Sequence, residues 1–215
     1  MTSSQWRTCL HEQHRLHGKT VFTVTELANI SGHSPHVLSV ELHRLCTQQI
    51  LVRYAQGRYG LPDAVTPESL VKHLDPGAYI TGAYALHRHN LITQVPVEIT
   101  CFTNRRHNRS RIRSTPLGRF AFICVRPPVY SPPDDAPLAP PEQALCDLIF
   151  LMRRKGLDAQ SQFTFRGLDR LDAQTLAHIA PRYPVTVIKM LHDMHLLSER
   201  KPQDGHTPSD ARPEK

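Results

Sequence analysis

Apolar residues near the start of the chain recur at spacings of three and four, which predicts short amphipathic helices. Trp6, Leu10 and Leu16 are expected to form the buried face of a first helix. Thr23 followed by Glu26 is a capping-box pattern, in which each side chain binds a free backbone N–H at the start of a helix. A second helix is therefore predicted to begin directly after Thr23.

The third predicted helix has the clearest apolar pattern in the chain. Ser34 and Pro35 are residue types that favour an N-cap and a first helical turn. Leu38, Leu42 and Leu45 then repeat at helical spacing and define one buried side. The remaining sides of this helix are expected to face outward.

The segment after the third helix has the pattern of a β-hairpin. Residues 50–55 and 58–61 are predicted to pair as two short strands joined by a tight turn. Three helices followed by a hairpin are the order of a winged helix-turn-helix. Thr66 then begins a short connector helix. Residues 1–74 are accordingly predicted to form a winged helix-turn-helix DNA-binding domain with its connector helix.

The following part of the chain, residues 75–200, is predicted to form a second domain with the order helix, hairpin, helix. Helical spacing from Tyr79 to Leu91 predicts its first helix, and alternation from Val95 to Cys101 predicts a strand. The return strand is expected at residues 120–125. Pro141 is expected in the first turn of the next helix.

The last predicted helices lie at residues 172–180 and 184–197, so the expected fold class is α+β. The tail, residues 201–215, contains several prolines and no large apolar residue. Because such a segment cannot bury apolar surface, it is predicted to be disordered.

The overall composition is that of a basic, globular protein. The chain has 215 residues, 40% of them apolar, and a formal net charge of +7, which favours an anionic partner. It has no apolar run of the roughly 20 residues needed to cross a bilayer and no apolar signal segment, so a cytoplasmic location without a membrane partner is expected. The five cysteines form no CxxC pair and predict neither a disulfide framework nor a zinc site.

The exposed side of the third helix and the hairpin carry the candidate DNA-binding residues. Polar side chains there can contact base edges or phosphates of double-stranded DNA, and each phosphate contact steepens the salt dependence of binding. Winged helices also serve as protein-binding modules, so an adaptor function remains an alternative. The candidate residues are Ser34, His36, Val37, Ser39, Val40, His43, Arg44, Arg53, Arg58 and Tyr59.

A second candidate surface is the arginine-rich turn expected between the two strands of the second domain. Five like charges in ten residues repel one another, and surface ion pairs stabilise a fold by only about 0 to 1 kcal/mol each. A structural role therefore explains them poorly, whereas an arginine fork suits phosphate or carboxylate. A merely solvated hairpin tip remains the alternative. The residues are Arg105, Arg106, Arg109, Arg111 and Arg113.

The histidines and carboxylates indicate no catalytic or metal centre. His11, His14 and His17 repeat every three residues, but no carboxylate or thiolate at a complementary spacing completes a metal site. The acidic residues that could serve a metal-dependent nuclease are spread over a loop and a helix start, without the clustering that such chemistry needs. No cofactor is expected, and a nuclease is the least favoured alternative. These acidic residues are Glu98, Asp134, Asp135, Glu142 and Asp147.

Four segments resemble those of the AbiEi family, namely GRYGLP, YITGAYALHRHNLITQVP, VEITCFTNRRHNR and APPEQALCDLIFLMRR. The resemblance extends over residues 5–197. It implies a transcriptional regulator with an N-terminal winged helix and a C-terminal antitoxin domain, in an abortive-infection (type IV) toxin-antitoxin system. Such a protein represses its own promoter and opposes a nucleotidyltransferase-like toxin without forming a stable complex. The resemblance thus places the antitoxin function in residues 75–200.

Overall fold

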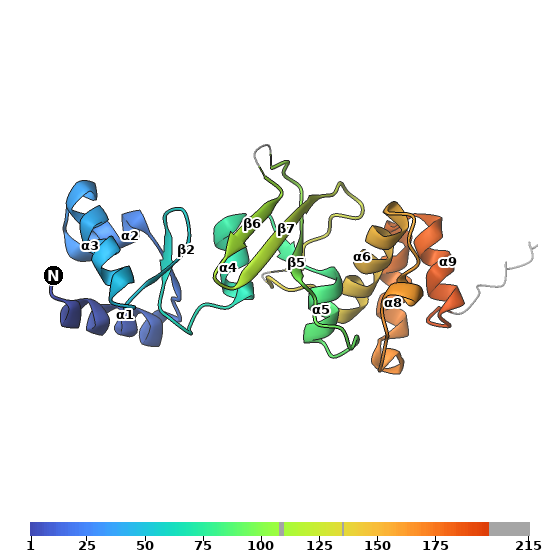
Figure 1. Ribbon diagram of the computed structural model, residues 1–215. Helices are drawn as coiled ribbons and strands as arrows, with labels where there is room; N and C mark the ends of the chain where they lie inside the picture. Colours follow the sequence, from blue (N-terminus) through green and yellow to red (C-terminus); the bar gives the residue numbers. More distant parts are fainter. Residues whose placement is uncertain (108–109, 135, 198–215) are drawn as a thin grey trace, which may run out of the picture.

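The computed structural model describes residues 1–107, 110–134 and 136–197, and it has a mixed α+β architecture. Arg109 and Asp135, which were singled out above, lie outside the described residues, as does the tail 201–215. Along the long axis of the molecule, a small helical unit is followed by a four-stranded sheet and then by a helical layer (Figure 1). No helix in the described ranges is long and apolar enough to cross a membrane.

The first unit contains three helices and three short antiparallel strands in the spatial order β1-β3-β2. Its core joins Trp6 and Leu10 to Leu38, Leu42 and Leu45, which confirms the predicted buried side of the third helix. Its elements are α1 (Ser3–His17), β1 (Val21–Thr23), α2 (Val24–Ser31), α3 (Pro35–Thr47), β2 (Val52–Ala55) and β3 (Arg58–Gly60).

The local signals at the helix starts are confirmed, but one prediction for α1 is wrong. Thr23 Oγ1 accepts from the Glu26 N–H at 3.2 Å, and Glu26 accepts from the Thr23 N–H at 2.7 Å, as a capping box requires. Leu16, by contrast, is 63% exposed. At about 100° per residue, Leu16 lies roughly 120° around the helix from Leu10, whereas Trp6 and Leu10 share one side.

The middle of the chain forms a mixed sheet in the order β4-β5-β7-β6, with the connector helix α4 and the short helix α5 beside it. The core of this sheet contains Phe120 and Phe122 of β7 and Leu70 and Leu74 of α4. The elements are α4 (Pro67–Leu74), β4 (Tyr79–Ile80), α5 (Gly82–Arg88), β5 (Glu98–Thr103), β6 (Ile112–Thr115) and β7 (Gly118–Cys124).

The predicted hairpin of this region is wrong, because β5 and β7 pair in parallel, with Ile99 opposite Phe120. The hairpin is formed by β6 and β7, which turn between Thr115 and Gly118. Strand β6 was missed because its sequence, IRST, has only one apolar residue and shows no alternation. The arginine-rich segment is consequently not a hairpin tip but the connection from β5 to β6.

Two further boundaries differ from the expectation. Tyr79 lies in strand β4 and the helix begins only at Gly82, since Thr81 between them has an extended backbone. Val95 and Val97 precede strand β5 and are exposed. Pro96 between them has no N–H to donate to a sheet, which explains why the strand begins later than the alternation predicted.

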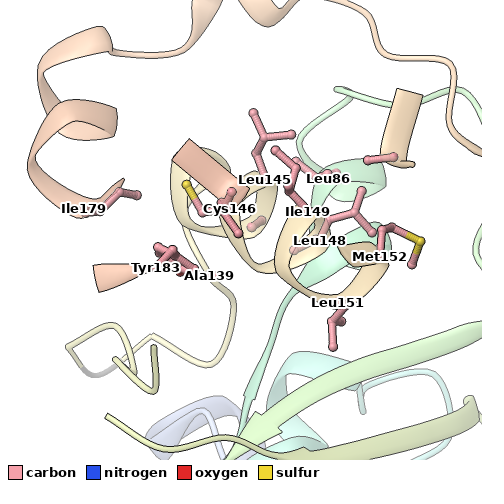
Figure 2. Packing of buried hydrophobic residues seen from close by; sticks show 14 of the residues in the cluster. Leu86, Ala139, Leu145, Cys146, Leu148, Ile149, Leu151, Met152, Ile179 and Tyr183 are labelled. Atoms are coloured by element: carbon pink, nitrogen blue, oxygen red, sulfur yellow. The ribbon is translucent and has the colours of Figure 1, made fainter. Parts of the chain in front are cut away.

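The last part of the chain is a layer of helices built around α6, which begins at Pro141 as predicted. Figure 2 shows Leu145, Leu148 and Ile149 of α6 beside Leu86 of α5, within one continuous core. The elements are α6 (Pro141–Arg154), α7 (Ala159–Gln162), η1 (Leu168–Arg170), α8 (Ala173–Ile179), η2 (Ala180–Arg182) and α9 (Val185–Asp193).

Helix α4 connects the first unit to the sheet. Leu70 and Leu74 share a core with Phe120, and the same core includes Val21 and Tyr54 of the first unit. Apolar packing therefore continues through the connector helix. The division into domains 1–74 and 75–200 remains a prediction.

Candidate functional site

The exposed side of α3 is the first candidate site. Leucines hold one side of this helix in the core, while His36, Val37, Ser39, Val40, His43 and Arg44 are exposed on the other sides. Val37 is 49% and Val40 is 68% exposed, which is unusual for valine in a helix whose other apolar residues are buried. Both line a shallow cavity of about 440 Å³ together with His33, His36, Glu41 and Arg44. Ser34, Ser39 and His43 are also exposed on α3 or at its start.

Glu41 anchors this helix to α1. Its carboxylate accepts a 2.7 Å hydrogen bond from the indole N–H of Trp6, and its other oxygen lies 3.3 Å from Nε2 of His33. Burial alone would raise the pKa of Glu41, but the Trp6 hydrogen bond and positive charges nearby, including His33, lower that pKa overall. Glu41 therefore acts as a charged anchor between α1 and α3.

Two arginines that the sequence assigned to DNA already have intramolecular partners. Arg44 lies 3.2 Å from Glu41 and donates to Ser3 Oγ at 3.1 Å. Arg58 donates from Nε to the backbone carbonyl of His73 at 3.2 Å and so ties β3 to α4. Arg44 thus helps to hold α1 against α3, and Arg58 ties the hairpin to the connector helix, which leaves both guanidinium groups less free for phosphate.

The other two hairpin candidates occupy neighbouring strands. Arg53 of β2 is exposed, and Tyr59 of β3 is half-buried against the core of the first unit. They are register partners across the β2–β3 pair. Arg53 on strand β2 is therefore accessible to a phosphate group.

A basic cavity of about 460 Å³ beside the central sheet is the second candidate site. Three of its arginines, Arg105, Arg106 and Arg111, come from the β5–β6 connection, and the fourth, Arg154, comes from the end of α6. All four are exposed. Arg154 was not predicted, because no local pattern indicates that the end of α6 lies against the β5–β6 connection. The remaining lining residues are His107, Phe122, Ile123 and Cys124.

Arg113 corrects the prediction that the whole arginine segment is a functional surface. It lies in β6 and is half-buried. Its Nη1 donates to the carbonyl of Leu74 at 2.8 Å, and its Nη2 lies 3.1 Å from Nδ1 of His107. Its guanidinium also lies over the ring of Phe122, 5.3 Å from the centroid. Arg113 therefore has a structural role that local charge repulsion did not reveal.

A buried aspartate lies beneath the basic cavity and holds the β5–β6 connection. Asp75, with a 2% exposed side chain, accepts hydrogen bonds from Thr103 Oγ1 at 2.7 Å and from His107 Nε2 at 2.9 Å. Because Arg113 can only donate, Nδ1 of His107 accepts and Nε2 carries the proton. Burial alone would raise the pKa of Asp75, but the hydrogen bonds from Thr103, Gly77 and His107 lower it overall.

A second buried carboxylate, Asp147, stabilises the helical layer. It accepts 2.7 Å hydrogen bonds from Thr81 Oγ1 and from the Tyr183 hydroxyl, and a longer one from Tyr79 at 3.4 Å. Burial raises its pKa to about 7, although these hydrogen bonds act in the opposite direction. The network connects β4, α6 and the segment that follows η2.

The acidic residues considered for a nuclease are not brought together. Glu98 pairs with Arg119 at 3.0 Å, and Glu142 accepts from the Asp172 N–H at 3.0 Å. Within residues 1–107, 110–134 and 136–197, no group of three or more histidine, cysteine or acidic side chains is placed to hold a metal ion. The nuclease alternative thus gains no support from the positions of these carboxylates.

Searches of protein-family models and of curated proteins found no match to this chain. Its function is therefore inferred from the residues and their arrangement.

Proposed function

We propose that the protein is a transcriptional regulator whose first unit is a winged helix-turn-helix that binds duplex DNA. The order helix, strand, helix, helix, strand, strand supports this assignment. The turn between α2 and α3 supports it as well, because Gly32 adopts φ 67°, a conformation that glycine allows without strain. In this proposal α3 enters the major groove and the β2–β3 hairpin lies along the flanking backbone.

The exposed side of α3 is the observation that carries the proposal. Val37 and Val40 can contact the methyl groups of thymine, while His36, Ser39 and His43 can bond base edges or phosphates. Arg53 on the hairpin is available for a phosphate. We expect Arg44 to contribute mainly by holding α1 against α3, and Arg58 by tying the hairpin to α4, through the contacts described above.

Changing Val40 to glutamate is expected to weaken binding to the protein's own promoter by more than about tenfold, because a carboxylate would face the DNA phosphates. Val185→Glu is the matched control, since Val185 is 65% exposed and lies on α9, outside the first unit. Fluorescence anisotropy with labelled promoter duplex over a series of salt concentrations measures both affinity and the salt slope. Equal affinity for the two variants would refute the placement of α3 in the groove.

A protein-binding adaptor is the second candidate function, favoured by the two exposed valines around the cavity on α3. A partner protein held by these valines would stay bound after nuclease treatment. The Val40→Glu variant would no longer bind this partner protein, while its affinity for the promoter would remain unchanged. DNA binding is preferred because the exposed side of α3 alternates small polar residues and histidines with these valines.

We also propose that the protein is the antitoxin of a type IV, AbiE-like system, in which it represses its own operon and opposes a nucleotidyltransferase-like toxin. The resemblance to the AbiEi family in residues 5–197 is the basis of this proposal. The exposed arginines of the β5–β6 connection are the candidate surface for it, and Arg113 is removed from that surface by its structural contacts.

The double change Arg105→Ala/Arg106→Ala is expected to abolish toxin neutralisation in cells while leaving promoter repression unchanged, because both side chains are exposed and strands β5 and β6, which their segment connects, lie well away from α3 (Figure 1). Arg126→Ala/Arg153→Ala removes the same charge from exposed positions outside the basic cavity and serves as the control. Growth after toxin induction and a promoter-reporter assay measure the two functions separately. Normal growth of the first variant would exclude this surface from neutralisation.

A further inference from the structure

We propose that the basic cavity beside the central sheet binds the polyphosphate group of a small ligand, of which a nucleoside triphosphate is the representative class. The cavity measures about 460 Å³, within the range of small-molecule sites. Arg105, Arg106, Arg111 and Arg154 surround it, and its lining contains no carboxylate among the described residues. Promoter binding by the first unit does not require this cavity, whereas Arg105, Arg106 and Arg111 also belong to the proposed antitoxin surface.

The charge balance of the cavity points to an anion. Some exposed arginines have acidic partners, as Arg119 has Glu98 at 3.0 Å and Arg88 has Glu68 at 3.4 Å, whereas others, such as Arg126 and Arg153, stand singly on the surface. Within the described part of the chain, the four cavity arginines have no carboxylate within 4.0 Å. Four like charges around one hollow repel one another, and a multiply charged anion would offset this repulsion while accepting the forked donors of arginine.

One part of the cavity wall, His107, is held in place before any ligand arrives. His107 is held between Asp75 at 2.9 Å and Arg113 at 3.1 Å, so both of its ring nitrogens are already occupied. His107 is therefore a positioning residue that fixes the connection carrying Arg105 and Arg106. Preorganisation of this kind reduces the ordering cost of binding.

The shape of the site favours clustered phosphates over an extended nucleic acid. The phosphates of a nucleic-acid strand are spread along its length, whereas the four arginines gather around a single hollow. The aromatic wall offers little to a base, because Phe122 is 1% exposed and is covered by His107 and Arg113. We therefore expect the number of linked phosphates, rather than the base, to determine affinity.

Binding of inorganic triphosphate to the full chain, measured by calorimetry at fixed ionic strength, tests the proposal. The wild type is expected to bind triphosphate more tightly than diphosphate and diphosphate more tightly than monophosphate, with ATP and GTP similar to each other. Arg154→Ala should weaken triphosphate binding by about tenfold, the loss typical of a hydrogen bond to a charged group. Arg105→Ala/Arg106→Ala should weaken it further.

Arg153→Ala is the matched control, because Arg153 is the exposed neighbour of Arg154 on α6 and lies outside the cavity lining. It removes the same charge and should change affinity less than twofold. Equal losses for Arg153→Ala and Arg154→Ala would show diffuse charge attraction and overturn the proposal. Failure to prefer triphosphate over monophosphate, or binding of single-stranded oligonucleotide without binding of triphosphate, would overturn it as well.

The same variants separate this proposal from the regulatory function. Val40→Glu should keep wild-type affinity for triphosphate, because α3 does not line the basic cavity. Arg154→Ala should keep wild-type affinity for promoter duplex. If the wild type binds triphosphate but not promoter duplex, the DNA-binding proposal fails. If it binds promoter duplex but not triphosphate, the proposal for the basic cavity fails.

Discussion

Replacing Asp75 with alanine is expected to lower the free energy of unfolding by about 2 to 6 kcal/mol, because two buried donors lose their acceptor and each unsatisfied donor costs about 1 to 3 kcal/mol. The variant would leave the Thr103 hydroxyl and the His107 ring N–H without their acceptor. The His107 ring would no longer be held in the orientation in which its Nδ1 accepts from Arg113. Asp75 is almost fully buried, so water cannot replace the lost hydrogen bonds without rearrangement. Chemical denaturation at pH 7 measures this loss.

Asp193→Ala is the control, because Asp193 lies exposed at the end of α9 and its replacement should change stability by less than about 0.5 kcal/mol. The Asp75→Ala variant should also bind triphosphate more weakly than the wild type at a temperature where it remains folded, since the β5–β6 connection loses its anchor. Wild-type stability in this variant would mean that the network around Asp75 does not hold the connection.

The pH dependence of this contribution follows from the lowered pKa of Asp75. A carboxylate whose pKa is lower in the folded than in the unfolded state stabilises the fold above its unfolded pKa, near 3.8. That stabilisation is lost as the pH falls through the folded pKa. The wild type should therefore lose stability below about pH 4, and Asp75→Asn should reduce the size of that loss.

Several helices were predictable because the signals that form them are local, whereas the short helix α7 was not predicted. The capping box of Thr23 and Glu26, the Pro35 and Pro141 helix starts and the leucine pattern of α3 each lie within one or two turns of sequence. Leu16 shows the limit of such patterns, because a position six residues after Leu10 does not return to the same side of the helix.

The sheet and the basic cavity depend on distant contacts that the sequence alone does not indicate. A turn of suitable length between two apolar strands suggested a hairpin, but a polar strand, β6, occupies that interval and makes β5 and β7 parallel. The strand pairing determines which arginines have structural contacts and which line the cavity. Arg113 becomes a structural residue of β6, while Arg154, far along the chain, joins Arg105 and Arg106 at one cavity.

Changing Asp147 to asparagine is expected to make the protein more stable than the wild type at pH 8, with a smaller gain in stability at pH 5. Burial raises the pKa of Asp147 from 3.8 to about 7, so the folded protein keeps a proton that the unfolded chain has already released. Between pH 3.8 and about 7 the wild type loses stability as the pH rises, because the unfolded chain can ionise this carboxyl in water while burial keeps it protonated in the folded protein. Asparagine is neutral at every pH and resembles the protonated acid, with one acceptor oxygen and one donor group.

The expected advantage of Asp147→Asn over the wild type grows by roughly 2 to 3 kcal/mol between pH 5 and pH 8, as linkage requires for a pKa raised to this extent. Denaturation curves of both proteins at pH 5, 6, 7 and 8 measure it. Asp193 is exposed, so the stability of Asp193→Asn should change with pH in parallel with that of the wild type over this range. If the Asp147→Asn curve also runs parallel to the wild type, Asp147 keeps its charge in the folded protein, and the hydrogen bonds from Thr81, Tyr79 and Tyr183 outweigh the cost of burial.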